Sequence, residues 1–461
     1  MTVVFSSVLF LFRFMPIAFL IYYLCPKKLK NLALMILSLF FYSWGEPKYF
    51  PIMLFSIVLD YTCGQGIKRF KDNPKMKRLF LILSMCGNLG MLGFFKYTNF
   101  FVNNLNALFG IELSGIYVAK LPLGISFYTF QTMSYTIDVY RGKVEAEDNI
   151  INFGAFVVLF PQLIAGPIVT YIDVQKELKD RTITLPMIDD GLRLFIMGVG
   201  SKVLIANNIG ALWTEVQTLG FANVSTPLVW LGVLAYSFQL YFDFSGYSLM
   251  AIGLGKMLGF HFPQNFNYPY ISKSVTEFWR RWHMTLGSWF REYVYIPLGG
   301  NRCSKARNFF NIFMVWFLTG FWHGANWNFI LWGLYFWVFL MIEKSFLLKK
   351  LEKSKVWSHI YLLSVVVISW AMFAVSDMGE LSALFSRLFA FDGGTDWIYY
   401  LQNYALIFIM AAVFSTPVLK KAYEKWGQHT WLKTAFLSVV MLLSVAYLVD
   451  STYNPFLYFN F

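Results

Sequence analysis

The residue with the clearest chemical potential is a histidine inside an apolar segment. His323 lies in FLTGFWHGANWNFILWGLYFW, from Phe317 to Trp337, close to Asn326 and Asn328. Burying an imidazole and two amides in hydrocarbon costs free energy unless each finds a partner. A neutral imidazole suits general-base chemistry because its unperturbed pKa of about 6.5 lies near operating pH. We therefore treat His323 as a candidate general base; the alternative is a core histidine that bonds a backbone carbonyl.

The sequence around His323 favours the functional interpretation. Gly320, Gly324 and Gly333 thin the helix surface and allow another group to approach closely. Residues 309–342 are predicted to form a hairpin that is short for two full crossings, which need about 20 residues each. The turn that carries His323 is therefore expected to end within the membrane.

His283 is the second candidate among the five histidines. It lies in segment 260–308, which is too polar to span a membrane. Ser274 and Glu277 have the spacing of a helix capping box, and aromatic residues follow at helical spacing. The pattern predicts an amphipathic helix at the cytoplasmic interface. It also suggests a basic entrance for a phosphate-bearing substrate; the alternative is contact with phospholipid headgroups. The candidate phosphate-binding residues are Arg280, Arg281 and Arg291.

The composition defines the class of protein. The chain has 461 residues, of which 57% are hydrophobic and 14% are charged, against about 25% charged in soluble proteins. Its net charge of +13 comes from basic clusters between apolar runs, which fits the positive-inside rule and not nucleic-acid binding. The first apolar run has no cleavage-site pattern and is expected to be a retained span. The four cysteines show no metal-ligand spacing and no disulfide framework, and no metal site is expected.

Apolar runs predict an all-α polytopic membrane protein of roughly 11–13 transmembrane or re-entrant helices. We expect a single membrane domain over 1–461, with N-terminal spans in 1–110, a catalytic core in 111–345 and C-terminal spans in 346–461. Region 110–186 is ambiguous and suggests broken or re-entrant helices. The predicted spans are 5–24, 31–44, 50–66, 79–95, 187–207, 227–257, the hairpin 309–342, 357–375, 398–418 and 434–450.

Several motifs together resemble the membrane-bound O-acyltransferase (MBOAT) family, in particular the branch that contains the membrane subunit of bacterial alginate O-acetylation. The resemblance covers essentially the whole chain and implies the MBOAT fold, with the helices around a central tunnel. It rests on YFDFSGYSLMAIG (Tyr241–Gly253), FPQNFNYPY (Phe262–Tyr270), EFWRRWHMTLGSWFREYVYIPLGGNR (Glu277–Arg302), FLTGFWHGANWNFILWG (Phe317–Gly333), FPQLIAGPI (Phe160–Ile168) and the opening VVFSSVLFLFRFMPI.

The resemblance implies acyl transfer from a thioester to a hydroxyl. The family's near-invariant histidine falls on His323 and its second histidine on His283. Asn326 is a candidate oxyanion donor because it is close to His323 in sequence. Leu249 stands where the family pattern has an acid, which leaves Asp243 as the only acid of its motif. Asp243 is either a substrate or oxyanion candidate or a structural partner for a nearby helix.

The resemblance also implies partners and a location. No bound cofactor is expected, and the donor substrate would be acetyl-CoA or another acyl-CoA, or a phosphopantetheine carrier protein. The acceptor would be an extracellular polysaccharide or a partner acetyltransferase protein, reached from a multi-pass position in the bacterial inner membrane among membrane lipids. The two alternatives are D-alanyl transfer to teichoic acids and a transporter without enzymatic activity. The enzyme hypothesis predicts that His283 and His323 face one tunnel.

Overall fold

The computed structural model describes residues 4–110, 117–118, 121–163, 166–425, 430–450 and 457. It is 79% helical, and the described residues contain no β-strand. Seven helical segments among them are long and apolar enough to cross a membrane. The predicted all-α polytopic fold class is confirmed, while the full number of 11–13 helices and the central tunnel stay predictions. The seven segments are Phe50–Arg69, Pro74–Phe109, Leu185–Leu219, Trp327–Leu351, Lys355–Ala374, Asp396–Phe414 and Thr430–Asp450.

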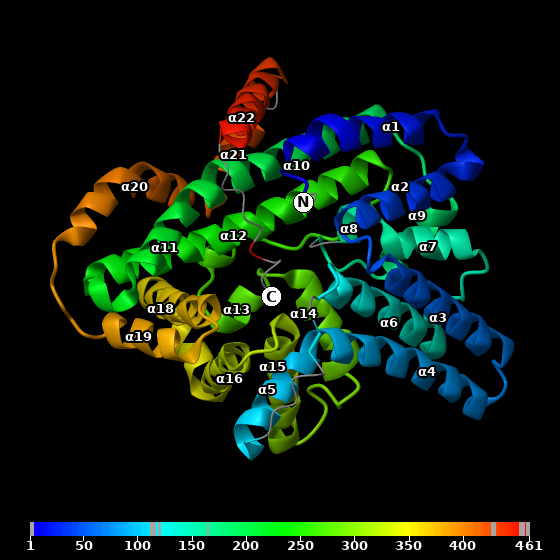
Figure 1. Ribbon diagram of the computed structural model, residues 1–461, viewed down its shortest axis with the longest axis horizontal. Helices are drawn as coiled ribbons and strands as arrows, with labels where there is room; N and C mark the ends of the chain where they lie inside the picture. Colours follow the sequence, from blue (N-terminus) through cyan, green and yellow to red (C-terminus); the bar gives the residue numbers. More distant parts are fainter. Residues whose placement is uncertain are drawn as a thin grey trace. The chain divides into compact units, whose positions relative to one another are not determined.

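The chain forms two compact units, Met1–Phe195 with Leu249–Pro263, and Ile196–Ser248 with Gln264–Phe461. The predicted division into 1–110, 111–345 and 346–461 stays a prediction. Unit 1 contains α1 (Met15–Leu24), α2 (Lys30–Gly45), α3 (Phe50–Arg69), α4 (Pro74–Leu92), α5 (Thr98–Phe109), α6 (Ile125–Arg141), α7 (Ile150–Val158), α8 (Phe160–Leu163), α9 (Tyr171–Lys179) and most of α10 (Leu185–Gly200). Figure 1 shows how these helices follow one another along the chain.

The described residues of the ambiguous region 110–186, which leave out 111–116, 119–120 and 164–165, are helical and broken, as expected. Helix α6 is buried along almost its whole length. The next apolar stretch is divided into α7 and the four-residue α8, with Leu159 between them outside a helical conformation. Both short helices are buried among the other helices of unit 1, where the surrounding protein tolerates irregular backbone.

A buried polar cluster that was not predicted from the sequence holds three helices of unit 1 together. Asp60 of α3 is fully buried. Its carboxylate accepts hydrogen bonds from Ser84 and Asn88 of α4 and from Thr136 of α6, the last two at 2.7 and 2.8 Å. These bonds compensate for the desolvation of the carboxylate. They fix the register of α3, α4 and α6, which lie side by side in Figure 1.

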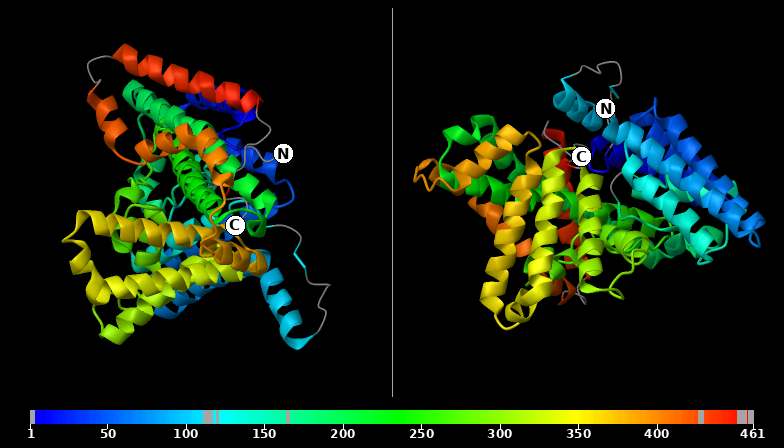
Figure 2. Two further views of the ribbon diagram at one scale, coloured as in Figure 1. Left: turned by 90° about the vertical axis from the view of Figure 1, so that its left-hand side faces the viewer. Right: turned by 90° about the horizontal axis from the view of Figure 1, so that it is seen from below.

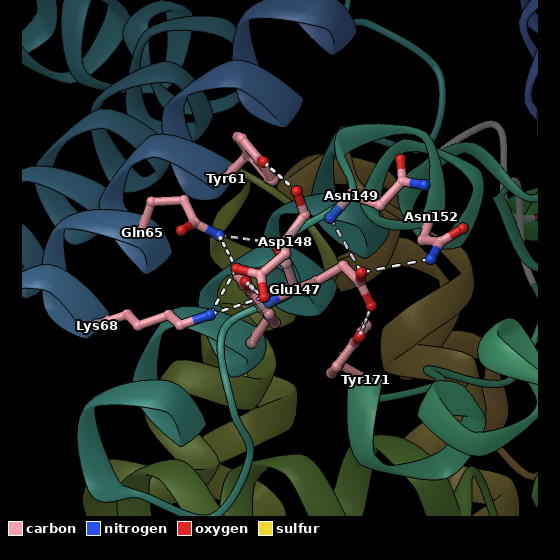
Figure 3. A network of polar contacts seen from close by, with 9 residues as sticks. Tyr61, Gln65, Lys68, Glu147, Asp148, Asn149, Asn152 and Tyr171 are labelled. Carbon is pink, nitrogen blue, oxygen red and sulfur yellow. Dashed lines mark hydrogen bonds and ion pairs between the residues drawn. The ribbon is translucent and has the colours of Figure 1, made fainter.

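A second polar network ties the end of α3 to the loop before α7 (Figure 3). Lys68 forms an ion pair with Asp148 at 2.5 Å, and Gln65 donates to the backbone carbonyl of Glu147 at 2.7 Å. The carboxylate of Glu147 accepts from the Tyr171 hydroxyl of α9 at 2.6 Å. These contacts anchor the loop that carries Glu147 and Asp148 to the C-terminal end of α3.

Unit 2 holds the end of α10 and all the elements that carry the two candidate histidines. The predicted hairpin forms as α15 and α16, which pack against each other, and α16 packs on α18 (Figure 2). The helices are α11 (Asn207–Leu219), most of α12 (Thr226–Met257), α13 (Val275–Trp279), α14 (Met284–Phe290), α15 (Lys305–His323), α16 (Trp327–Ile342), α17 (Leu348–Leu351), α18 (Lys355–Ala374), α19 (Met378–Leu388), α20 (Asp396–Phe414), α21 (Val418–Lys425) and α22 (Thr430–Asp450).

Candidate functional site

His323 is the last residue of α15 and lies at the turn of the hairpin, as predicted. Gly324 follows in an extended conformation and ends the helix. The imidazole is 6% exposed. The rings of Trp322, Trp332 and Phe373 surround it in edge-on arrangements, with centroid distances of 5.1, 5.1 and 5.2 Å. The histidine is therefore held in an aromatic cage built from both arms of the hairpin and from α18.

The glycines near His323 bring the two arms of the hairpin into close contact. A Cβ atom on Gly320 would clash with the backbone carbonyl of Phe329, and one on Gly333 would clash with that of Trp316. A Cβ atom on Gly324 would clash with the Phe329 ring. The predicted close approach is therefore present, and the group that approaches is the facing arm of the hairpin.

The two asparagines after His323 have different environments. Asn326, the predicted oxyanion candidate, is exposed at the N-cap position of α16. Asn328 is fully buried and donates to the backbone carbonyls of Met372 and Phe373 at the end of α18. Asn328 therefore stabilises the contact between the hairpin and α18, a role that was not predicted.

The segment that carries His283 begins as predicted but is not one continuous helix. The Ser274 hydroxyl accepts the backbone N–H of Glu277 at 3.0 Å, which caps α13. Helix α13 ends at Trp279, and α14 begins only at Met284. His283, between them, has a positive φ of 44°. Since a left-handed residue cannot continue a right-handed helix, the expectation of one amphipathic helix through His283 is corrected.

A buried carboxylate fixes this segment to the hairpin. Glu343, directly after α16, is 1% exposed. It accepts the backbone N–H groups of Val275 and Thr276 at 2.6 and 2.9 Å, and also the Thr276 hydroxyl at 2.6 Å. The first N–H groups of a helix need such acceptors, and a negative charge at this end is favourable. The segment with His283 is therefore attached to the element that follows the hairpin.

His283 is buried and held in one orientation. Its Nδ1 lies 3.0 Å from Asn265 Oδ1, and its ring packs edge-on against Phe244 at a centroid distance of 4.7 Å. Burial lowers the pKa of His283 to about 3. The imidazole is therefore neutral across the physiological pH range.

The two candidate histidines meet at one tryptophan. The ring centroids of His283 and Trp322 are 6.2 Å apart, and those of Trp322 and His323 are 5.1 Å apart. Residues 40 positions apart in the sequence thus contact the same indole. This juxtaposition is the main geometric feature of the candidate site, and the tunnel expected between the histidines stays a prediction.

The three arginines of the segment are not equivalent. Arg281 forms an ion pair with Glu277 at 2.9 Å and donates to the backbone carbonyl of Asn267 at 3.1 Å. Arg280 and Arg291 are exposed. Arg281 is thus committed to holding the segment, while Arg280 and Arg291 remain accessible to a phosphate-bearing molecule.

Asp243 forms a buried ion pair with a lysine that the sequence reasoning missed. Lys202 Nζ lies 2.7 Å from Asp243 Oδ1, and both side chains are almost fully buried. The other oxygen, Oδ2, accepts the backbone N–H of Leu457 at 3.0 Å. The geometry favours the structural alternative for Asp243. One lysine and one aspartate in two apolar runs were the signal that could have predicted this pair.

The fold and the site define a multi-pass membrane protein with two neighbouring buried histidines, and comparisons with known proteins identify its family. Residues 146–378 match the model of MBOAT, the membrane-bound O-acyltransferase family. The chain belongs to this family. The matched region contains both histidines, Asn265 and Glu343.

Individual relatives agree with this assignment. The chain is 38% identical to a probable alginate O-acetylase (AlgI) of Pseudomonas putida, across 99% of this chain and 100% of that protein. It is 32% identical to a peptidoglycan O-acetyltransferase of Helicobacter pylori, across 99% and 97%. A teichoic acid D-alanyltransferase of Streptococcus thermophilus is 32% identical across 50% of this chain and 58% of that protein. The protein is therefore an O-acyltransferase, and these findings favour the enzyme over the transporter alternative.

Proposed function

We propose that this protein transfers an acetyl group from a thioester donor in the cytoplasm to a hydroxyl group on the outer side of a bacterial inner membrane. The hydroxyl would belong to an extracellular polysaccharide or to a partner acetyltransferase protein. The observation that carries the proposal is the meeting of His283 and His323 at Trp322, inside the region that matches the family. Two O-acetylating relatives, the probable AlgI of P. putida and the peptidoglycan O-acetyltransferase of H. pylori, match along 99% of this chain.

His323 would act as the general base in this reaction. Its imidazole takes the proton from the acceptor hydroxyl as the oxygen attacks the thioester carbonyl. The tetrahedral intermediate then collapses, the C–S bond breaks, and the thiolate takes the proton from the imidazolium. The aromatic cage of Trp322, Trp332 and Phe373 keeps the imidazole in place and limits access of water. His283, which stays neutral, would orient a substrate.

Donor binding would fall to the exposed arginines. Arg280 and Arg291 are exposed guanidinium groups in the segment that carries the buried His283. We propose that they hold the phosphates of acetyl-CoA or of a phosphopantetheine arm, with Arg281 supporting the backbone between them. For the oxyanion, Asn326 remains the proposed donor, although in its exposed position it would have to turn toward the site.

D-alanyl transfer is the second candidate for the activity. The D-alanyltransferase relatives match 50% and 46% of this chain, whereas the AlgI relative from P. putida matches 99%. Acetyl transfer is therefore the proposal. We propose that residues 1–461 act as a single membrane domain in this acetyl transfer.

The test is an assay with purified protein in proteoliposomes and three labelled donors: acetyl-CoA, an acetylated carrier protein and a D-alanylated carrier protein. The proposal expects hydrolysis or transfer of the acetyl group and none of the D-alanyl group. Activity with the D-alanylated carrier alone would establish the second candidate. Inactivity with all three donors, under conditions where the protein is folded, would contradict both.

A further inference from the structure

Asn265 caps the N-terminus of α14, the short helix that follows His283, although it is distant from this helix in the sequence. The backbone carbonyl of Asn265 accepts the N–H of Met284 at 2.9 Å. Its side-chain Oδ1 accepts the N–H of Thr285 at 3.3 Å and the Thr285 hydroxyl at 2.9 Å. The N-cap residue itself, His283, makes no side-chain cap. The first two N–H groups of α14 therefore depend on Asn265 for their acceptors.

The same oxygen determines which nitrogen of His283 carries the proton. A backbone N–H can only donate, so the amide atom facing Thr285 N must be the oxygen of Asn265 and not its nitrogen. That oxygen lies 3.0 Å from His283 Nδ1 and can only accept. Nδ1 of a neutral imidazole must then be the protonated nitrogen, which places the lone pair on Nε2.

We propose that Asn265 is a positioning residue that fixes His283 as the Nδ1–H tautomer, so that Nε2 accepts a hydrogen bond from an O–H or N–H group of the substrate. The claim that a substrate group donates to Nε2 rests on the proposed function. The claim about the tautomer rests on the geometry alone. Nε2 is buried, and no described group of the protein is hydrogen-bonded to it. A buried acceptor of this kind is costly unless a partner donates to it, which fits a substrate group.

The surroundings of His283 support a neutral hydrogen-bond acceptor and not an acid. The ring is enclosed by Phe244 of α12, Trp322 of α15 and Asn265. His323, a second titratable group, packs against the same Trp322 ring. Burial alone lowers the pKa of His283, and no charged side chain contributes. The imidazole therefore remains uncharged in the presence of the base His323, which avoids repulsion when His323 takes a proton.

The left-handed backbone at His283 is stabilised by the same residue, Asn265. A non-glycine residue at φ 44° is strained and persists only where its surroundings hold it. Here the backbone and the side chain of Asn265 accept the N–H groups of Met284 and Thr285, which directly follow His283. Asn265 therefore contacts both the imidazole of His283 and the backbone that follows the left-handed turn.

The experiment is ¹⁵N-histidine NMR of the full chain in lipid bilayers, which distinguishes the two neutral tautomers and the imidazolium. Only five histidines contribute signals, and His283→Gln assigns the relevant one. We expect His283 to be Nδ1–H with a bare Nε2 from pH 8 to pH 5. A signal from Nε2–H, or from imidazolium at pH 7, would overturn the proposal whether or not the protein transfers acetyl groups.

Two variants and a matched control test the role of Asn265. Asn265→Leu removes the acceptor and should give a mixture of tautomers with a roughly tenfold lower kcat/KM, as expected for one misplaced hydrogen bond. Asn265→Asp keeps the acceptor, so it should keep Nδ1–H and retain more activity. Its carboxylate should also raise the pKa of His283 and add an acid limb to the pH profile. Thr285→Val, which removes one bond to the same oxygen, should leave the tautomer unchanged.

The outcomes separate the inference from the proposed function. An unchanged tautomer in Asn265→Leu would show that another group sets it and would refute the inference. If Asn265→Leu does not fold, the wild-type spectrum and the pH profile of Asn265→Asp still test whether Asn265 sets the tautomer of His283. If the tautomer and its response to Asn265→Asp are as expected but none of the donors is turned over, the positional assignment stands and the proposed function fails.

Discussion

At the scale of single residues, the candidate site consists of groups whose roles differ because their surroundings differ. His323 is enclosed by aromatic edges from three elements, whereas His283 is tied to a polar amide. Arg281 is engaged in an ion pair, while Arg280 and Arg291 are exposed. These different surroundings, together with the buried ion pair of Lys202 and Asp243, lead to two predictions.

The first concerns the arginines. Replacing Arg280 and Arg291 together by alanine should raise the apparent KM for acetyl-CoA more than it lowers kcat, because these residues would hold a part of the donor far from the reacting carbonyl. Arg281→Ala should chiefly lower the thermal stability of the protein through loss of its bond to Glu277. Steady-state kinetics at several salt concentrations provide the measurement. An unchanged KM together with weaker membrane association would indicate headgroup contact instead.

The second concerns the buried ion pair of Lys202 and Asp243. Asp243→Asn should destabilise the protein by about 3–5 kcal/mol, because it leaves Lys202 as a buried charge without its counter-ion. The double variant Lys202→Met/Asp243→Leu removes both charges and should recover most of the stability and the activity. Thermal unfolding and transfer assays on the three proteins test this. A stable but inactive double variant would show that Asp243 takes part in catalysis.

At the scale of elements, the hairpin depends on a glycine contact between its arms. Gly320→Ala or Gly333→Ala would push a methyl group into the facing backbone and should cost about 1–3 kcal/mol, with displacement of His323. Gly90→Ala in α4 is the matched control, since nothing lies within 4 Å of the added carbon. Unfolding midpoints and transfer rates should fall in the two hairpin variants only. Equal behaviour of all three variants would contradict the proposed contact.

The sequence predicted the helices better than the breaks within segments and the polar contacts between helices. Apolar runs of about 20 residues give clear signals, so the hairpin and helices such as α3, α12 and α18 lie close to their predicted bounds. The helical segments Pro74–Phe109 and Leu185–Leu219 extend well beyond the predicted spans 79–95 and 187–207. The break between α13 and α14 was missed because a left-handed histidine has no local signature. The Glu343 cap and the Asp60 cluster join residues far apart in the chain. Such pairings depend on tertiary packing, which periodicity does not report.

At the scale of the whole molecule, the family and the candidate site come from different observations that agree. The region that matches the family contains every residue of the candidate site, and the AlgI relative extends over nearly the entire chain. FPQNFNYPY (Phe262–Tyr270) carried the family resemblance, but only the structure gives Asn265 a role within it. A family motif thus located the site, and the geometry distinguishes the roles of its members.

The most direct test of the central claim compares two histidine variants in one assay. His323→Ala and His261→Ala are reconstituted in proteoliposomes, and transfer of a labelled acetyl group is measured at saturating donor. His261 is an exposed histidine paired with Glu177 and serves as the control. We predict that His323→Ala loses about 10²–10⁴-fold in rate, the usual contribution of a positioned general base, while His261→Ala stays near wild type. Near-wild-type transfer by folded His323→Ala would show that His323 is a core histidine and that the mechanism is wrong.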